Sequence, residues 1–124
     1  MSRVLLVEDE ELNRVLVRAI IARAGSPAVR EVDLVEAGSL ADARTALTAG
    51  RVDVVLLDVN LPDGNGLELA AELNEAPARP TVIALTASVL PHERAAAMAA
   101  GCDAFLDKPY AAADLVTMLA NHIG

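Results

Sequence analysis

Five short apolar segments alternate with helical segments along this chain of 124 residues, and this alternation constrains the fold more than any other feature. The first segment, Arg3–Val7, has the Val and Leu content typical of a strand buried on both faces. A strand–helix alternation repeated five times predicts an α/β fold, with a parallel sheet and helices on both faces. The expected strands are Arg3–Val7, Glu31–Glu36, Val52–Leu57, Thr81–Leu85 and Asp103–Leu106.

The helical segments are bounded by residues that favour helix ends. Ser39 is a predicted N-cap, and Gly50 closes the helix that follows it. Pro91 suits the first turn of a helix, where its missing N–H costs nothing. No helix or strand is predicted for residues 26–30. The expected helices are Leu12–Arg23, Leu40–Ala49, Leu67–Asn74, Pro91–Ala100 and Ala112–His122.

Composition narrows the class of protein. The formal net charge is −8, from 18 acidic and 10 basic residues, which argues against direct binding to nucleic acid or to anionic membranes. No apolar run approaches the ~20 residues of a transmembrane helix, and the N-terminus has no signal-peptide pattern. Cys102 is the only cysteine, so no disulfide framework is possible. We therefore expect one cytoplasmic domain.

Polar and charged residues follow the carboxyl ends of the predicted strands. Glu8 and Asp9 follow the first strand, and Asp58 follows the third. Thr86 follows the fourth strand, and Lys108, the only lysine of the chain, follows the fifth. Ligands of open parallel sheets bind beyond these ends, so we expect the five side chains to converge at one rim.

The expected convergence of these five side chains indicates a site for phosphoryl transfer. Three crowded carboxylates repel one another, and Mg²⁺ would neutralise them while keeping positions open for phosphate oxygens. Lys108 adds a fixed positive charge and Thr86 a hydroxyl donor, which are the groups that a phosphoryl-transfer site needs. A carboxylate can itself become an aspartyl phosphate, and Asp58, before a glycine-rich loop, is best placed for this role.

Several fragments, taken in order, closely resemble the receiver domains of two-component response regulators, and the resemblance covers essentially the whole chain. It implies a flavodoxin-like (βα)₅ three-layer sandwich with strand order 2-1-3-4-5, and a single receiver domain over residues 1–124. Among receiver domains, the sequence especially resembles those of hybrid histidine kinases. The fragments are Leu6-Val7-Glu8-Asp9-Glu10, Asp53-Val54-Val55-Leu56-Leu57-Asp58, Leu61-Pro62-Asp63-Gly64-Asn65-Gly66-Leu67-Glu68-Leu69, Ile83-Ala84-Leu85-Thr86-Ala87 and Gly101-Cys102-Asp103-Ala104-Phe105-Leu106-Asp107-Lys108-Pro109.

The resemblance also implies roles for the residues at the rim. Asp58 would be the phospho-acceptor, and Lys108 would contact the phosphoryl group. Glu8, Asp9, Asp58 and the backbone carbonyl of Asn60 would bind Mg²⁺. The bond between Lys108 and Pro109 is expected to be cis, as in similar receivers.

By the same resemblance, Thr86 would be the switch hydroxyl and Phe105 the switch aromatic. Phosphorylation would draw Thr86 toward Asp58, and Phe105 would turn into the vacated space. The surface formed by Pro91–Ala100, Asp103–Leu106 and Ala112–His122 would then change. Its two helices are rich in Ala and nearly uncharged, which favours docking of a downstream protein partner.

The implied phosphoryl donor is a phosphohistidine on a sensor histidine kinase or a histidine phosphotransfer protein. The protein would not be an enzyme, apart from catalysing its own phosphorylation and dephosphorylation; Asn60 and Ser88 would tune the lifetime of the phosphoryl group. Two alternatives remain open. A phosphatase of the haloacid dehalogenase type would need a second aspartate where this chain has Asn60. A degenerate receiver would bind partners without phosphorylation.

Overall fold

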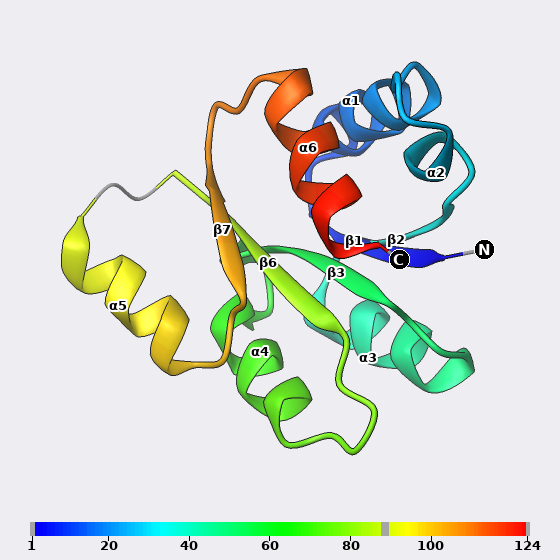
Figure 1. The fold of residues 1–124 in the computed structure, drawn as a ribbon. Coiled ribbons are helices and arrows are strands. Elements are labelled where there is room, and N and C mark those ends of the chain that lie inside the picture. The colour runs from blue at the N-terminus through cyan, green and yellow to red at the C-terminus, as the bar shows by residue number, and fades with distance from the viewer. Residues whose placement is uncertain (1, 88–89, 124) are drawn as a thin grey trace.

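A parallel five-stranded sheet forms the middle of three layers (Figure 1). The computed structural model describes residues 2–87 and 90–123. The strands lie in the order β2-β1-β3-β6-β7, which confirms the predicted flavodoxin-like order, and a two-stranded antiparallel ribbon, β4-β5, follows β3. The elements are β1 (Arg3–Val7), α1 (Glu11–Ala22), α2 (Pro27–Arg30), β2 (Asp33–Ala37), α3 (Leu40–Ala49), β3 (Val54–Asp58), β4 (Asn60–Leu61), β5 (Gly64–Asn65), α4 (Gly66–Asn74), β6 (Thr81–Thr86), α5 (Pro91–Ala99), β7 (Ala104–Asp107) and α6 (Ala112–His122).

The two faces of the sheet carry separate hydrophobic cores. Helices α3, α4 and α5 cover one face, and α1, α2 and α6 cover the other (Figure 1). Strand β3 lies at the centre, and all five of its residues are buried. Within the described ranges, no helix combines the length and apolar character needed to cross a membrane.

The second strand begins later than predicted, because a helical turn precedes it. Ser26 caps α2 by accepting a hydrogen bond from the backbone N–H of Val29 at 3.4 Å, and Pro27 occupies the first helical position. The backbone N–H of Glu31 then bonds to the Pro27 carbonyl and closes the turn. Glu31 therefore belongs to the end of α2, and the strand predicted over Glu31–Glu36 is observed over Asp33–Ala37.

The last strand begins one residue later than predicted, because the side chain of Asp103 bonds to the backbone of the neighbouring strand. Its Oδ2 accepts a hydrogen bond from the backbone N–H of Val82 at 2.8 Å, which ties the start of β7 to β6. At the other end of β7, the backbone N–H of Lys108 bonds to the Thr86 carbonyl at 2.7 Å. The bond between Lys108 and Pro109 is cis, as expected.

Candidate functional site

The carboxyl ends of the central strands bring the predicted site residues together. Glu8 and Asp9 follow β1, Asp58 ends β3, Thr86 ends β6, and Lys108 follows β7. The Lys108 ammonium lies 3.3 Å from Glu8 Oε2 and 3.3 Å from Asp58 Oδ2. One carboxylate oxygen each from Glu8, Asp9 and Asp58 lies within 4.8 Å of the other two. Residues that are far apart in sequence thus form one acidic site.

The loop after β3 packs closely against Asp58. The backbone N–H of Asn60 donates to Asp58 Oδ1 at 3.1 Å and so orients the carboxylate. Helix α4 begins against the end of β3, and the Gly66 N–H bonds to the Val59 carbonyl at 2.7 Å. A Cβ atom at Gly66 would lie 2.2 Å from the Asp58 carbonyl oxygen. Only glycine therefore allows this close approach.

Burial increases the free-energy cost of keeping the groups of this site charged. Glu8 is 2% exposed and Asp58 is 6% exposed, whereas Asp9 is exposed. Burial raises the pKa of Glu8, and the hydrogen bond to Asp58 raises it further. Burial alone would lower the pKa of Lys108, but attraction to Asp58 and Glu8 outweighs it and raises that pKa. One ammonium, paired with two of the three carboxylates, leaves an excess of negative charge, which suits a cation with oxygen ligands.

Two residues of helix α1 contact Glu8, and the sequence analysis predicted no role for either of them. The Asn13 amide donates to Glu8 Oε1 at 2.6 Å. The Arg14 guanidinium donates to the Glu8 backbone carbonyl at 2.7 Å. The position of these two residues just after the acidic turn was the only available signal, because nothing in the sequence shows which group faces Glu8.

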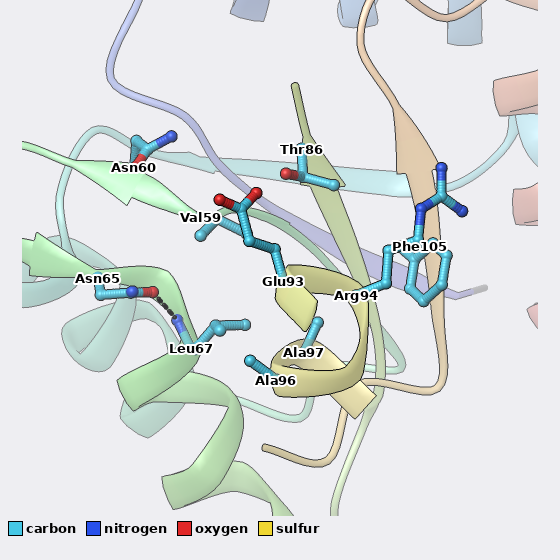
Figure 2. A pocket seen from close by; sticks show the side chains of 10 residues that line it. All are labelled: Val59, Asn60, Asn65, Leu67, Thr86, Glu93, Arg94, Ala96, Ala97 and Phe105. Atoms are coloured by element: carbon cyan, nitrogen blue, oxygen red, sulfur yellow. Dashed lines mark hydrogen bonds between the residues drawn. The ribbon is translucent and has the colours of Figure 1, made fainter. Parts of the chain in front are cut away.

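A cavity of about 260 Å³ lies beside the acidic site, lined by residues of the β4-β5 ribbon, α4, α5, β6 and β7 (Figure 2). Thr86 and Phe105 both line it, so the structure places the predicted switch residues around one space. The Arg94 guanidinium lies 4.8 Å from the centre of the half-buried Phe105 ring, and it also pairs with Asp107. Arg94 of α5 thus contacts two residues of β7.

The comparisons with known proteins agree with this geometry. Residues 4–120 match the family described as the response regulator receiver domain. The two-component response regulator ORR41 of Oryza sativa subsp. japonica is 38% identical over 121 residues, which is 98% of this chain and 94% of the relative. The aerobic respiration control sensor protein ArcB of Escherichia coli strain K12 is 37% identical over 119 residues, which is 94% of this chain but only 14% of ArcB.

Solved structures have the same fold. The receiver domain of sensor histidine kinase PA1611 from Pseudomonas aeruginosa PAO1 is 28% identical, with a TM-score of 0.84 over 99% of this chain and 98% of that one. That structure has a magnesium ion coordinated in its active site cleft. Chemotaxis protein CheY4 of Vibrio cholerae has a TM-score of 0.86 at 24% identity over 98% of both chains, and it supports the fold alone.

Proposed function

The chain belongs to the response regulator receiver family, and from this membership we propose that Asp58 is its phosphorylation site. Receiver domains accept phosphoryl groups in two-component signalling and act with histidine kinases or phosphotransfer proteins. The observation that carries the proposal is the position of the Lys108 ammonium, 3.3 Å from both Asp58 and Glu8. A buried carboxylate at the centre of the sheet, beside a fixed cation, is suited to nucleophilic attack on phosphorus.

The chain's own groups account for most of the proposed reaction. An Asp58 oxygen attacks the phosphorus atom, the bond from phosphorus to the donor nitrogen breaks, and that nitrogen takes up a proton. The Asn60 N–H, on Oδ1 at 3.1 Å, fixes the carboxylate for attack. Lys108, on Oδ2 at 3.3 Å, is placed to bond the incoming phosphoryl oxygens.

The residues present fit a Mg²⁺ site. We propose that Glu8, Asp9, Asp58 and the backbone carbonyl of Asn60 hold the ion, since the three carboxylates meet within 4.8 Å and carry more negative charge than Lys108 balances. When bound, the ion would neutralise charge on the carboxylates and on the transferring phosphoryl oxygens.

Removal of divalent metal tests this part of the proposal. We expect EDTA to block phosphorylation of the wild-type chain by acetyl phosphate, because the buried carboxylates would then repel the phosphoryl oxygens. Intact-mass spectrometry over a time course measures the uptake, and excess Mg²⁺ added after EDTA should restore it. Equal uptake with and without divalent metal would eliminate the magnesium site.

We also propose a switch through Thr86 and Phe105. The Thr86 hydroxyl would bond to the phosphoryl group, and Phe105 would turn into the cavity that both residues line (Figure 2). Arg94, which contacts the ring and pairs with Asp107, would transmit the change to α5. The altered surface is the face formed by α5, β7 and α6, and it would dock a downstream protein. Ser88, which was expected to tune the phosphoryl lifetime, lies outside the described residues.

Thr86→Ala separates phosphorylation from the switch. We expect this variant to accept phosphate within about tenfold of the wild-type rate, because Thr86 provides neither the nucleophile nor a metal ligand. The chemical-shift changes that phosphorylation causes at Phe105 and along α5 should shrink strongly. Nuclear magnetic resonance spectra of both proteins, with and without phosphate, measure this. Wild-type shift changes in the variant would rule out the switch role of Thr86.

The remaining parts of the proposal concern the phosphoryl donor, the loss of the phosphoryl group and the cellular location. The donor would be a phosphohistidine on a sensor kinase or a phosphotransfer protein, and phosphotransfer profiling against candidate donors tests it. Autodephosphorylation would occur by attack of water on the same acyl phosphate. Residues 1–124 would form one receiver domain acting in the cytoplasm, without direct contacts to nucleic acid or membrane.

A further inference from the structure

Glu8 is held at both its side chain and its backbone by consecutive residues of one helix. Asn13 donates to Glu8 Oε1 at 2.6 Å, and Arg14 donates to the Glu8 carbonyl at 2.7 Å. The Glu8 N–H also bonds to the Ala37 carbonyl of β2 at 2.9 Å. The backbone of Glu8 is therefore fixed to two neighbouring elements, and only its side-chain rotation remains to be set.

The Asn13 amide sets that rotation. A glutamate side chain has several rotamers, and the carboxylate of Glu8 is 2% exposed, so each orientation needs a protein partner for its oxygens. With Oε1 bonded to Asn13, Oε2 lies 3.3 Å from the Lys108 ammonium. In this orientation the carboxylate also meets those of Asp9 and Asp58.

An amide suits this position because it is neutral. Lys108 already bonds to Oε2. A second cation at Oε1 would compete with a metal ion for the carboxylate, whereas an amide donates a hydrogen bond without adding positive charge. The two arginines of α1 direct their guanidinium groups to acceptors other than the Glu8 carboxylate. Arg14 bonds to the Glu8 carbonyl and, at 3.6 Å, to Glu36, and Arg18 pairs with Glu36 at 3.1 Å.

We propose that Asn13 is a positioning residue for the metal site, whose amide holds the Glu8 carboxylate in the orientation that completes the set with Asp9 and Asp58. This inference rests on the proposed function of the site. Partners that orient metal ligands typically change metal affinity by about 10–100-fold when they are removed. Asn13 should therefore act on the metal requirement rather than on the phosphoryl-transfer step.

The test is the Asn13→Leu variant of the full chain. Leucine has the same branched shape as asparagine, although it is bulkier, and it donates no hydrogen bond. It also leaves less room than alanine for a water molecule to replace the amide. Two quantities are measured: Mg²⁺ binding to the unphosphorylated protein by calorimetry, and the Mg²⁺ concentration that gives half-maximal phosphorylation by acetyl phosphate. Asn121→Ala, at an exposed position of α6, is the control. If Asn13→Leu does not fold, as judged by circular dichroism, Asn13→Ala takes its place under the same criterion.

We expect the variant to bind Mg²⁺ about 10–100-fold more weakly and to need correspondingly more Mg²⁺, while its phosphorylation rate at saturating Mg²⁺ stays near that of wild type. Wild-type Mg²⁺ affinity in the folded variant would overturn the inference, as would a lower maximal rate with no change in metal requirement. If the wild-type chain itself neither bound Mg²⁺ nor required it, the proposed function would fail instead, so the two failures are distinguishable.

Discussion

Asp58→Asn is expected to abolish phosphate uptake from acetyl phosphate, with a loss on the order of 10³-fold or more. The amide keeps the shape of the side chain, but its nitrogen and carbonyl oxygen are poor nucleophiles and cannot form a stable acyl phosphate. The backbone around residue 58 should not change, because β3 is held by its pairing with β1 and β6. Folding should be preserved, since the substitution removes the repulsion between Asp58 and Glu8, and Lys108 keeps Glu8 as its partner.

Intact-mass spectrometry after incubation with acetyl phosphate and Mg²⁺ measures the effect. The control is Asp114→Asn, which makes the same chemical change at an exposed position in the first turn of α6. The control should be labelled like wild type. A labelled Asp58→Asn protein would transfer the acceptor role to another carboxylate.

Lys108→Ala is expected to slow phosphorylation by about a hundredfold to a thousandfold, the usual effect of losing one group that stabilises developing charge. Lys108 bonds to both Glu8 and Asp58, so its removal also leaves two buried carboxylates without their shared cation. Lys108 stays protonated at neutral pH, because the two carboxylates raise its pKa in spite of burial.

The same variant should show a change in stability with pH. Burial and the bond to Asp58 raise the pKa of Glu8, whereas Lys108 opposes this rise, so removing Lys108 should raise that pKa further. A carboxyl group whose pKa is raised by folding stabilises the fold below its unfolded pKa, and this contribution is lost as pH rises through the folded value. The variant should therefore lose more stability than wild type between acidic and neutral pH.

Rapid-quench phosphorylation and denaturant unfolding at several pH values measure both effects. Arg51→Ala is the matched control, because Arg51 is an exposed cation just before β3, at the opposite end from Asp58. The control should match wild type in both measurements. A Lys108→Ala protein that is phosphorylated at the wild-type rate would remove Lys108 from the proposed mechanism.

The course of the backbone was predictable because its signals are local. Apolar segments marked the strands, and the Ser39 cap predicted α3, where its Oγ accepts from the Asp42 N–H at 3.1 Å. Helix α2 was missed because a single turn of four residues has no periodicity to detect. Asp103 was assigned to a strand, although it bonds with its side chain to the start of a different strand.

The contents of the acidic site were predictable for a different reason. Strand ends of a parallel sheet meet at one edge, so Glu8, Asp58 and Lys108 could be grouped before their distances were known. The groups around them could not be assigned in this way. The contacts of Asn13 with Glu8 and of Arg94 with Phe105 depend on side-chain length and direction across a turn or between elements. Such contacts leave no repeating pattern in a sequence.

The acceptor role of Asp58 can be tested by locating the phosphoryl group in the wild-type protein. The chain is incubated with acetyl phosphate and Mg²⁺, the acyl phosphate is reduced with borohydride to mark its position as homoserine, and the digested peptides are sequenced by mass spectrometry. We expect homoserine at residue 58 and at no other aspartate. Homoserine at another position, or an unmarked Asp58 in a protein that carries phosphate, would contradict this expectation.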